Sequence, residues 1–228
     1  MMKLKKSIIG MIHLSGNNPV ERALEEIKIY EEEGLHGIII ENYHGTTDDI
    51  IETLQCVDTK MKVGINILPN NYDEALLNAS FYKADFIQLD HISGTYRKNT
   101  TLDKEDYLKY RNKYKDISVF GGVWPKYYEP IAGSSLEDDL NNGKLLCDAI
   151  VVTGKGTGKS TPLDKIIKFR EVLKDFPLII GACLNIDNVS EQMKYADGAI
   201  VGSAFKPNGD TTKFVDSRLV NKFMKLIN

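Results

Sequence analysis

The sequence predicts an α/β protein whose eight parallel strands close into a (β/α)8 barrel, and three observations support this fold class. Short apolar runs alternate with helix-like stretches along the whole chain. The eight strand-helix units are roughly 28 residues long, which matches a compact barrel. The runs are continuously apolar, as in parallel strands buried on both faces. An open, doubly wound sheet is the alternative, but eight uninterrupted units favour closure.

The expected strands are the eight apolar runs, of which Ile38-Ile39-Ile40 is an example. They cover residues 7–13, 37–42, 62–68, 85–90, 118–123, 148–153, 177–182 and 198–202. The longest connections follow the fourth strand, at residues 91–102, and the fifth, at residues 124–134. Both fall on the face where barrel chemistry occurs, so we interpret them as candidate lids.

Helix signals occupy the intervals between these strands. Asn18-Pro19-Val20-Glu21 provides an N-cap, a proline at the first helical position and an early carboxylate, and Gly34 ends the stripe that follows. Thr161-Pro162-Leu163-Asp164 repeats this start. A third stripe predicts the last helix and consists of Leu219, Val220, Phe223, Met224 and Ile227.

Composition limits the classes of function. Residues 1–228 contain no linker or low-complexity tract, so we expect a single barrel domain. The formal net charge of -3 offers no global basic field for nucleic acid. No apolar stretch approaches the ~20 residues of a membrane helix, so the protein is not expected to be membrane-embedded. The basic start lacks a long apolar region and a cleavage site, which predicts a cytoplasmic location.

Active sites of (β/α)8 barrels use residues at the C-terminal ends of the strands, so the strand ends supply the catalytic candidates. Glu41 follows three apolar residues, where a carboxylate is costly unless it is paired or used. Burial would raise its pKa toward the range of a general acid or base. The alternative is an ion pair with a lysine at the barrel rim. Asp90 is similar but borders a long loop.

His13 and Lys126 complete the catalytic candidates. His13 ends the first strand, and the alternative for it is a core histidine bonded to backbone. Lys126 lies among Trp124, Tyr127 and Tyr128, which form either a stacking wall for a ligand ring or a loop packed on itself. Glu41, Asp90 and His13 could act as acid and base, or Glu41 and Asp90 could hold a divalent cation, the one cofactor considered.

Phosphate is the predicted ligand group at the ends of the seventh and eighth strands. Both strands end in glycine, and backbone N–H groups near helix starts attract anions. Ser203 and Lys206 are expected to add side-chain contacts. The other candidate ligand contacts at strand ends are Asn66, Thr153, Gly154, Gly158, Gly181, Ala182, Asn185 and Gly202.

Gly158-Lys159-Ser160 is similar to the end of a P-loop, but the motif requires a glycine where this chain has Thr153. A P-loop also follows an early strand of an open sheet, which is not the fold expected here, so we reject a P-loop NTPase. The glycine loop can still surround an anion, with Lys155 or Lys159 adding charge.

Seven phrases, found in order along nearly the whole chain, form a specific set. They are Gly10-Met11-Ile12-His13-Leu14, Ile40-Glu41-Asn42-Tyr43, Asn66-Ile67-Leu68-Pro69-Asn70, Ala84-Asp85-Phe86-Ile87, Asp148-Ala149-Ile150-Val151-Val152-Thr153-Gly154 with Thr157-Gly158, Gly198-Ala199-Ile200-Val201-Gly202-Ser203, and Val215-Asp216. The set resembles the BtpA/SgcQ family. The resemblance implies a single (β/α)8 barrel of the ribulose-phosphate-binding type. One member is tied by name to photosystem I biogenesis and others to sugar metabolism, with no reaction attached to the family as a whole.

The chain departs from the family pattern at two strands. The family's fifth-strand phrase resembles Asp-Val-His-Val-Lys-His, whereas this chain has Gly122-Val123-Trp124-Pro125-Lys126-Tyr127, which keeps only the lysine. The fourth-strand phrase usually ends in Arg-Val-Asn but here reads Gln88-Leu89-Asp90. If the family's chemistry uses the missing groups, this protein has altered or lost it.

Two hypotheses of different classes follow. The leading one is an enzyme that acts on a small phosphorylated metabolite, a sugar phosphate or a nucleotide, by isomerase, lyase or hydrolase chemistry. The rival is a non-catalytic binding or assembly factor, which the missing fifth-strand residues favour. Nucleic-acid binding is disfavoured, and association into a homo-oligomer is an expectation drawn from other barrels.

Overall fold

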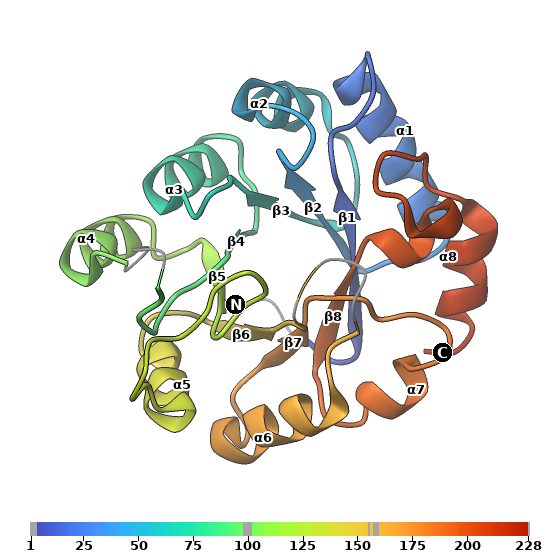
Figure 1. Cartoon of the computed structure of the whole chain (residues 1–228). Helices are drawn as coiled ribbons and strands as arrows, with labels where there is room; N and C mark the ends of the chain where they lie inside the picture. The colour runs from blue at the N-terminus through green and yellow to red at the C-terminus, as the bar shows by residue number, and fades with distance from the viewer. Residues whose placement is uncertain (1–3, 98–101, 155, 157–159, 228) are drawn as a thin grey trace.

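The computed structural model describes residues 4–97, 102–154, 156 and 160–227. Within these residues, eight parallel strands form a closed barrel in chain order, with β1 paired to both β2 and β8 (Figure 1). Helical segments separate successive strands and surround the barrel. The predicted (β/α)8 fold class is therefore confirmed.

The observed strands all lie inside the predicted ranges, and each is shorter than predicted. They are β1 (Ser7–Ile12), β2 (Gly37–Glu41), β3 (Lys62–Asn66), β4 (Phe86–Leu89), β5 (Ser118–Gly122), β6 (Ala149–Val152), β7 (Leu178–Ile180) and β8 (Gly198–Val201). Several candidate site residues, among them His13, Asp90 and Thr153, therefore lie just beyond a strand. Glu41 and Asn66 are the last residues of β2 and β3 and are register partners.

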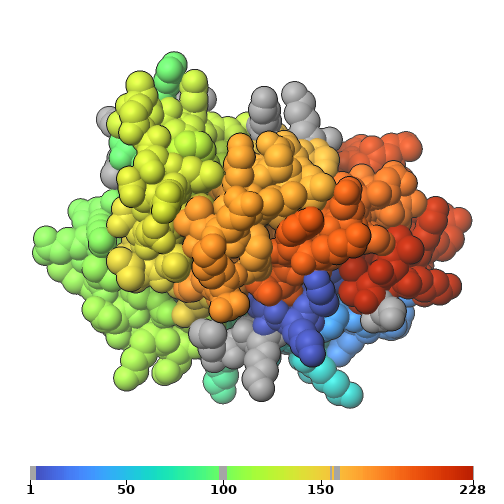
Figure 2. All heavy atoms as spheres, turned by 90° about the horizontal axis from the view of Figure 1, so that it is seen from below, coloured from blue at the N-terminus to red at the C-terminus, as the bar shows by residue number. Residues whose placement is uncertain are grey.

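The helices begin near the predicted signals. The α-helices are α1 (Pro19–Glu32), α2 (Thr47–Cys56), α3 (Tyr72–Phe81), α4 (Lys104–Lys113), α5 (Leu136–Lys144), α6 (Leu163–Leu173), α7 (Val189–Gln192) and α8 (Ser217–Met224), and two 3-10 helices, η1 (Ser203–Phe205) and η2 (Pro207–Gly209), follow β8. Gly34 adopts a φ of +78° just after α1, as a C-terminal stop requires. Figure 2 shows the side formed by α5 to α8, where neighbours in the sequence are also neighbours around the barrel.

The barrel interior is filled by its own apolar cluster. Inward-facing side chains alternate with outward-facing ones along each strand. The inward set is Ile9, Met11, Ile39, Phe86, Phe120, Ala149, Val151, Ile179 and Ile200. The Phe86 and Phe120 rings stack with centroids 4.5 Å apart. These side chains fill the barrel interior, so chemistry is confined to the face at the C-terminal ends of the strands.

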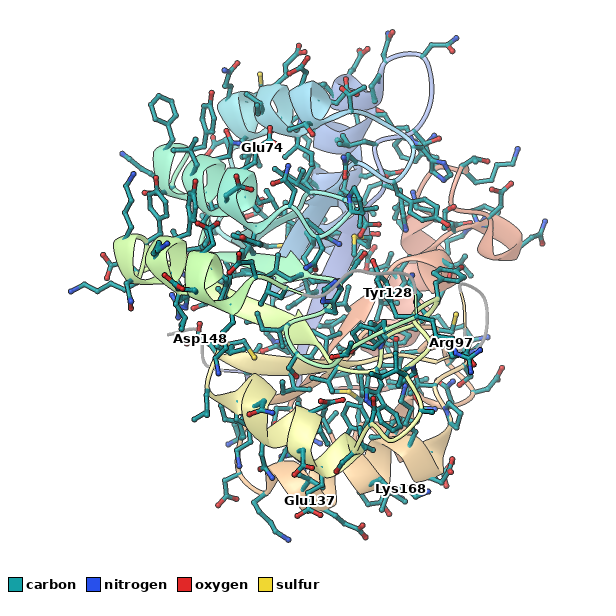
Figure 3. The ribbon with its side chains drawn as sticks, turned by 60° about the vertical axis from the view of Figure 1, so that its left-hand side comes forward. Glu74, Arg97, Tyr128, Glu137, Asp148 and Lys168 are labelled. Atoms are coloured by element: carbon teal, nitrogen blue, oxygen red, sulfur yellow. The ribbon has the colours of Figure 1, made fainter. Side chains whose placement is uncertain are left out.

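The loops after β4 and β5 pair with each other above the barrel. Tyr96 and Pro130 form an antiparallel bridge, and the Arg97 N–H donates to the carbonyl of Glu129 at 3.0 Å. Arg97 and Tyr128, one from each loop, lie on the same side of the barrel (Figure 3). The loops predicted as separate candidate lids are thus joined into one arch at these residues.

Among the described residues, no helix combines the length and the apolar character needed to span a bilayer.

Candidate active site

A cavity of about 100 Å³ lies at the C-terminal ends of the strands and gathers residues from around the barrel. This volume is below the ~300–1,000 Å³ of pockets for drug-sized ligands. Nine of the predicted site residues line it, namely His13, Glu41, Asp90, Lys126, Thr153, Gly181, Ala182, Gly202 and Ser203.

Strand alternation explains why these residues meet. Side chains two residues apart on a strand share a face, so the residues after the inward apolar cluster also point inward. Glu41 follows Ile39, and Thr153 follows Val151, in each case at a spacing of two. The same spacing places Gln88, which the sequence analysis did not select, in the cavity wall between Phe86 and Asp90.

Glu41 is a buried carboxyl with a defined hydrogen-bond partner. Its side chain is 8% exposed, and the Asn66 amide donates to Oε2 at 2.6 Å. Burial raises the pKa of Glu41 to about 7; the positive charge of Lys126 opposes this shift, the negative charge of Asp90 adds to it, and the Asn66 hydrogen bond opposes it. Both protonation states of Glu41 are therefore accessible near neutral pH. Asn66 thus holds the Glu41 carboxyl in place through this hydrogen bond.

Asp90 is the second carboxyl of the cavity and is half-buried. Burial raises its pKa, while Lys126 and hydrogen bonds from Tyr128 and Asn66 act in the opposite direction. The Tyr128 hydroxyl donates to Oδ2 of Asp90 at 3.3 Å. Tyr128 belongs to the predicted stacking wall and lines the cavity, and its hydroxyl connects this wall to Asp90.

Lys126 is held at the cavity by the loop after β5. Its backbone N–H donates to Oγ1 of Thr153 at 2.7 Å, and its ammonium lies 5.8 Å from the centroid of the Tyr127 ring. Trp124, predicted to share the stacking wall, instead directs its indole N–H to Asp139 at 2.8 Å. The loop thus presents Lys126, Tyr127 and Tyr128 to the cavity and turns Trp124 toward α5.

His13 is a neutral histidine in the cavity wall. Burial lowers its pKa to about 3, and the positive charges of Lys206, His44, Lys126 and Arg22 add to this shift. Its ring packs against Tyr43 and His44 with centroid separations of 5.8 and 6.4 Å. A neutral imidazole can donate from one nitrogen and accept at the other. The sequence alternative was a core histidine bonded to backbone; the side chain is indeed buried, at 7% exposed, but its Nδ1 has no hydrogen-bond partner among the described residues.

The glycines at the ends of β7 and β8 have packing roles. A Cβ on Gly202 would lie 2.7 Å from Cε1 of His13, and one on Gly181 would lie 2.4 Å from Cγ1 of Val151. Beyond Gly202, η1 begins at Ser203. Within the described residues, the backbone N–H groups of Ser203 and Ala204 make no hydrogen bond, as expected for the start of a helix. They are donors available beside the cavity.

Some predicted ligand contacts lie outside this group. Asn185 forms a local turn, in which its side chain accepts from the N–H of Asp187 at 2.9 Å. Gly154 borders an adjoining groove with Lys165. Gly158, together with Lys155 and Lys159 of the predicted anion loop, falls outside the described residues.

The expected contact of Lys206 with the ligand is corrected by the structure. Lys206 is 2% exposed and does not line the cavity. Its ammonium donates to both oxygens of Glu26, at 2.9 and 3.2 Å, in a buried ion pair with α1. A buried lysine is stable only beside such a partner, and the ion pair keeps the ammonium of Lys206 out of direct contact with a ligand in the cavity.

The described residues contain no group of three or more His, Cys, Asp or Glu side chains placed to hold a metal ion. Glu41 and Asp90 by themselves would need further oxygen ligands, from water or a bound phosphate, to complete the shell of a divalent cation.

Gln88, Cys183 and Thr211 are polar cavity residues that the sequence analysis did not select. Strand alternation from Asp90 could have identified Gln88. Thr211 lies well past β8, in a segment with no motif, so only the folded chain brings it to the cavity.

The sequence model of the BtpA family matches residues 4–228. An uncharacterized protein of Methanocaldococcus jannaschii is 31% identical, with 98% of this chain and 96% of the relative covered. The photosystem I biogenesis protein BtpA of Synechocystis is 26% identical, with 96% and 86% covered. An uncharacterized mitochondrial protein of Caenorhabditis elegans is 27% identical, with 97% and 92% covered.

Solved structures of similar fold include two enzymes. Phosphoribosyl anthranilate isomerase from Thermococcus kodakaraensis superposes with a TM-score of 0.66 at 14% identity, covering 98% of this chain and 99% of that one. Tryptophan synthase from M. tuberculosis gives a TM-score of 0.69 at 11% identity, covering 99% and 94%. At such identities these likenesses show the fold alone.

Proposed function

The chain belongs to the BtpA family, and on that premise we propose that it is an enzyme transferring protons on a small phosphorylated metabolite at the C-terminal face of its barrel. The observation that carries the proposal is one cavity that holds the buried carboxyl of Glu41 and the half-buried carboxyl of Asp90 together with Lys126. Withdrawing two acids from water in one cavity is costly, and such arrangements are favoured where their protonation is used.

The three groups have complementary roles in this proposal. Glu41, with a pKa of about 7, gives or takes a proton on the substrate. Lys126 stabilises negative charge that develops on the substrate as the proton moves. Asp90, held by Tyr128, serves as the partner acid or base. Isomerase, lyase and hydrolase reactions all use such transfers. The site therefore supports a proton-transfer step without selecting one of these three reaction classes.

The opposite wall of the cavity supports binding of the phosphate. The N–H groups of Ser203 and Ala204 are donors at the start of η1, and Ser203 lines the cavity. Backbone donors at helix starts favour anions. In the proposal, the phosphate lies against β7 and β8 while the reacting carbon lies over β2 and β4.

The test is proton exchange with solvent. A panel of sugar phosphates is incubated with the protein in D2O, and loss of carbon-bound proton signals is followed by NMR. For a compound that exchanges, Glu41→Gln and Asp90→Asn should each lower the rate by about 100-fold or more, the usual contribution of general acid–base catalysis. Glu52→Gln, on the exposed surface of α2, is the matched control and should leave the rate unchanged.

Two results would reject parts of the proposal. Rates that survive in both cavity variants would remove the roles of Glu41 and Asp90. Binding of a phosphorylated compound with neither exchange nor turnover would favour a non-catalytic binding protein, a role compatible with the name of the Synechocystis relative. In crystals soaked with inorganic phosphate, an anion that never occupies the start of η1 would refute the phosphate assignment.

A further inference from the structure

A cluster of three charged side chains, two of them buried and one half-buried, holds the segment after β8 against α1. We call residues 206–216 the strap. The cluster consists of Arg22 and Glu26 on α1 and Lys206 at the start of the strap. Glu26 is 1% exposed and Lys206 2% exposed. Their burial excludes a role in contacting solvent or a diffusing ligand directly.

Glu26 is the centre of the cluster. Its carboxylate accepts from the Lys206 ammonium at 2.9 and 3.2 Å, from Nε of Arg22 at 3.1 Å and from the backbone N–H of Val215 at 3.2 Å. Since a buried carboxylate needs several donors, these contacts satisfy the hydrogen-bonding capacity of Glu26 inside the protein.

The two cations of the cluster also hold the strap directly. The Arg22 guanidinium donates to the carbonyl of Thr212 at 2.9 Å and to that of Lys213, and it lies 5.5 Å from the ring centroid of Phe214. Lys206 donates to the carbonyl of Lys213 at 3.0 Å. Four consecutive strap residues, 212–215, are therefore fixed by one cluster.

The fixed strap reaches the cavity through Thr211. Thr211 lines the cavity, and its hydroxyl lies 2.9 Å from Nε2 of His44. The backbone N–H of His44 donates to the backbone carbonyl of His13 at 3.1 Å. A continuous set of contacts thus leads from α1, through the strap, to the cavity wall beside Ser203.

The cluster also carries charge. Two cations and one carboxylate leave a net charge of +1, and charges away from water act over longer distances than exposed ones. The positive charges of Lys206 and Arg22 contribute to lowering the pKa of both His13 and His44. The field of the cluster therefore reaches the side of the cavity formed by β8 and β1.

We propose that the Arg22–Glu26–Lys206 cluster is a positioning group for the anion-binding side of the cavity, holding Thr211 in place and attracting an anion through space without touching it. This inference rests on the proposed function for the anionic character of the ligand. It assigns Lys206 an indirect role in place of the direct contact expected from the sequence.

A charge series tests the through-space part. Glu26→Gln raises the net charge of the cluster to +2, Lys206→Met lowers it to 0, and the double variant returns it to +1. Affinity for inorganic phosphate is measured by calorimetry at low salt. We expect roughly fivefold tighter binding for Glu26→Gln, roughly fivefold weaker binding for Lys206→Met and near-wild-type binding for the double variant, as Coulomb's law in a partly screened site indicates.

A purely structural role predicts a different pattern, because all three variants would then bind phosphate more weakly. That pattern overturns the inference. If Lys206→Met does not fold, the comparison of wild type, Glu26→Gln and the double variant decides, since tighter binding in Glu26→Gln has no structural explanation. Weaker binding in Glu26→Gln overturns the inference even then.

Thr211 provides the test of the strap. Thr211→Val replaces the hydroxyl by a methyl group and should weaken phosphate binding, whereas Thr211→Ser, which keeps a hydroxyl, should bind phosphate like the wild type. Equal phosphate affinity in wild type and Thr211→Val would remove Thr211 from the site.

A second readout separates this inference from the proposed function. If the wild type binds no inorganic phosphate, the phosphate assignment fails, but the field of the cluster remains measurable through the titration of His44 by NMR. His44 faces Lys206, Arg22, Asp210 and His13. Lys206→Met should raise the pKa of His44 and Glu26→Gln should lower it; shifts of the same sign, or none, overturn the inference independently of phosphate.

Discussion

At the scale of single residues, Glu41 links the stability of the protein to pH. Burial raises its pKa from 4.5 to about 7, so folding disfavours the ionised form. The stability contributed by protonated Glu41 is full below pH 4.5 and is lost as the pH rises through 7. Glu41→Gln removes this loss, so the variant should be more stable than wild type at pH 8 by about 2–3 kcal/mol and similar at pH 4.

Urea unfolding at pH 4 and pH 8 measures this difference. Glu52→Gln, an exposed substitution on α2, is the control and should follow the wild type at both values. A stability difference between wild type and Glu41→Gln that does not change with pH would show that Glu41 does not titrate as proposed.

Gly202 is predicted to be irreplaceable because of His13. An alanine Cβ would lie 2.7 Å from Cε1 of His13, so the ring must move. Gly202→Ala should cost about 1–3 kcal/mol of unfolding free energy, as overpacking usually does, and should shift the NMR signals of His13. Gly156→Ala is the control, since its Cβ would meet the nearest atom, on Tyr127, at an ordinary 3.5 Å. An unshifted His13 in Gly202→Ala would contradict the packing argument.

Single residues also show what the sequence can and cannot reveal. Glu41 is visible in the sequence because a carboxylate that ends an apolar run needs a partner or a use. Lys206 was misassigned because its partner, Glu26, lies 180 residues earlier. The two meet only when β8 closes against β1, and no local pattern encodes that contact.

At the scale of elements, Lys165 of α6 is predicted to hold the loop after β5. Its ammonium donates to the carbonyls of Trp124 and Thr153, both at 2.8 Å. Lys165→Met leaves both carbonyls without this donor, which should cost about 1–3 kcal/mol and loosen the loop. Trp124 is the single tryptophan of the chain, so its fluorescence, measured at pH 7, should move to longer wavelength as water reaches it.

Lys168→Met is the matched control on the same helix, because Lys168 is exposed on the outer surface (Figure 3). The control should leave both the fluorescence and the unfolding free energy near the wild-type values. Unchanged fluorescence in Lys165→Met would show that other contacts suffice to hold the loop.

The elements themselves were largely predictable. Apolar runs identified all eight strands, because strands buried on both faces are predominantly apolar. The end of each strand was predicted too late, for instance at residue 182 for β7, which ends at Ile180. Hydrogen-bonded pairing ends where neighbouring strands diverge. That point is a property of the whole sheet and has no signal within one strand. The contact between Tyr96 and Pro130 likewise has no local signal.

At the scale of the whole molecule, closure of the barrel converts strand alternation into a site. The inward positions of all eight strands converge, with apolar side chains in the lower layers and polar ones in the last layer. The sequence predicted which strand ends would meet because the fold class fixes their common edge. It did not predict which of them would point inward, since that depends on the register of each strand.

Packing between β3 and β4 offers a test of how tightly the interior of the closed barrel is filled. A Cβ on Gly64 would lie 2.2 Å from Cε2 of Phe86, whose ring fills the space that the glycine leaves and stacks on Phe120. Gly64→Ala should therefore destabilise the protein by about 2–3 kcal/mol through overpacking, and Phe86→Leu by about 1–2 kcal/mol through lost burial.

Because the smaller leucine makes room for the alanine, the double variant Gly64→Ala/Phe86→Leu should be more stable than the sum of the two losses predicts, by about 1 kcal/mol or more. Urea unfolding of the four proteins gives this coupling directly. Gly64→Ala combined with Phe223→Leu is the control, because Phe223 packs on the outside of the barrel in α8 and should give additive losses. Additive losses for Gly64 and Phe86 as well would mean that the interior relaxes around each change separately, contrary to a barrel filled by interlocking side chains.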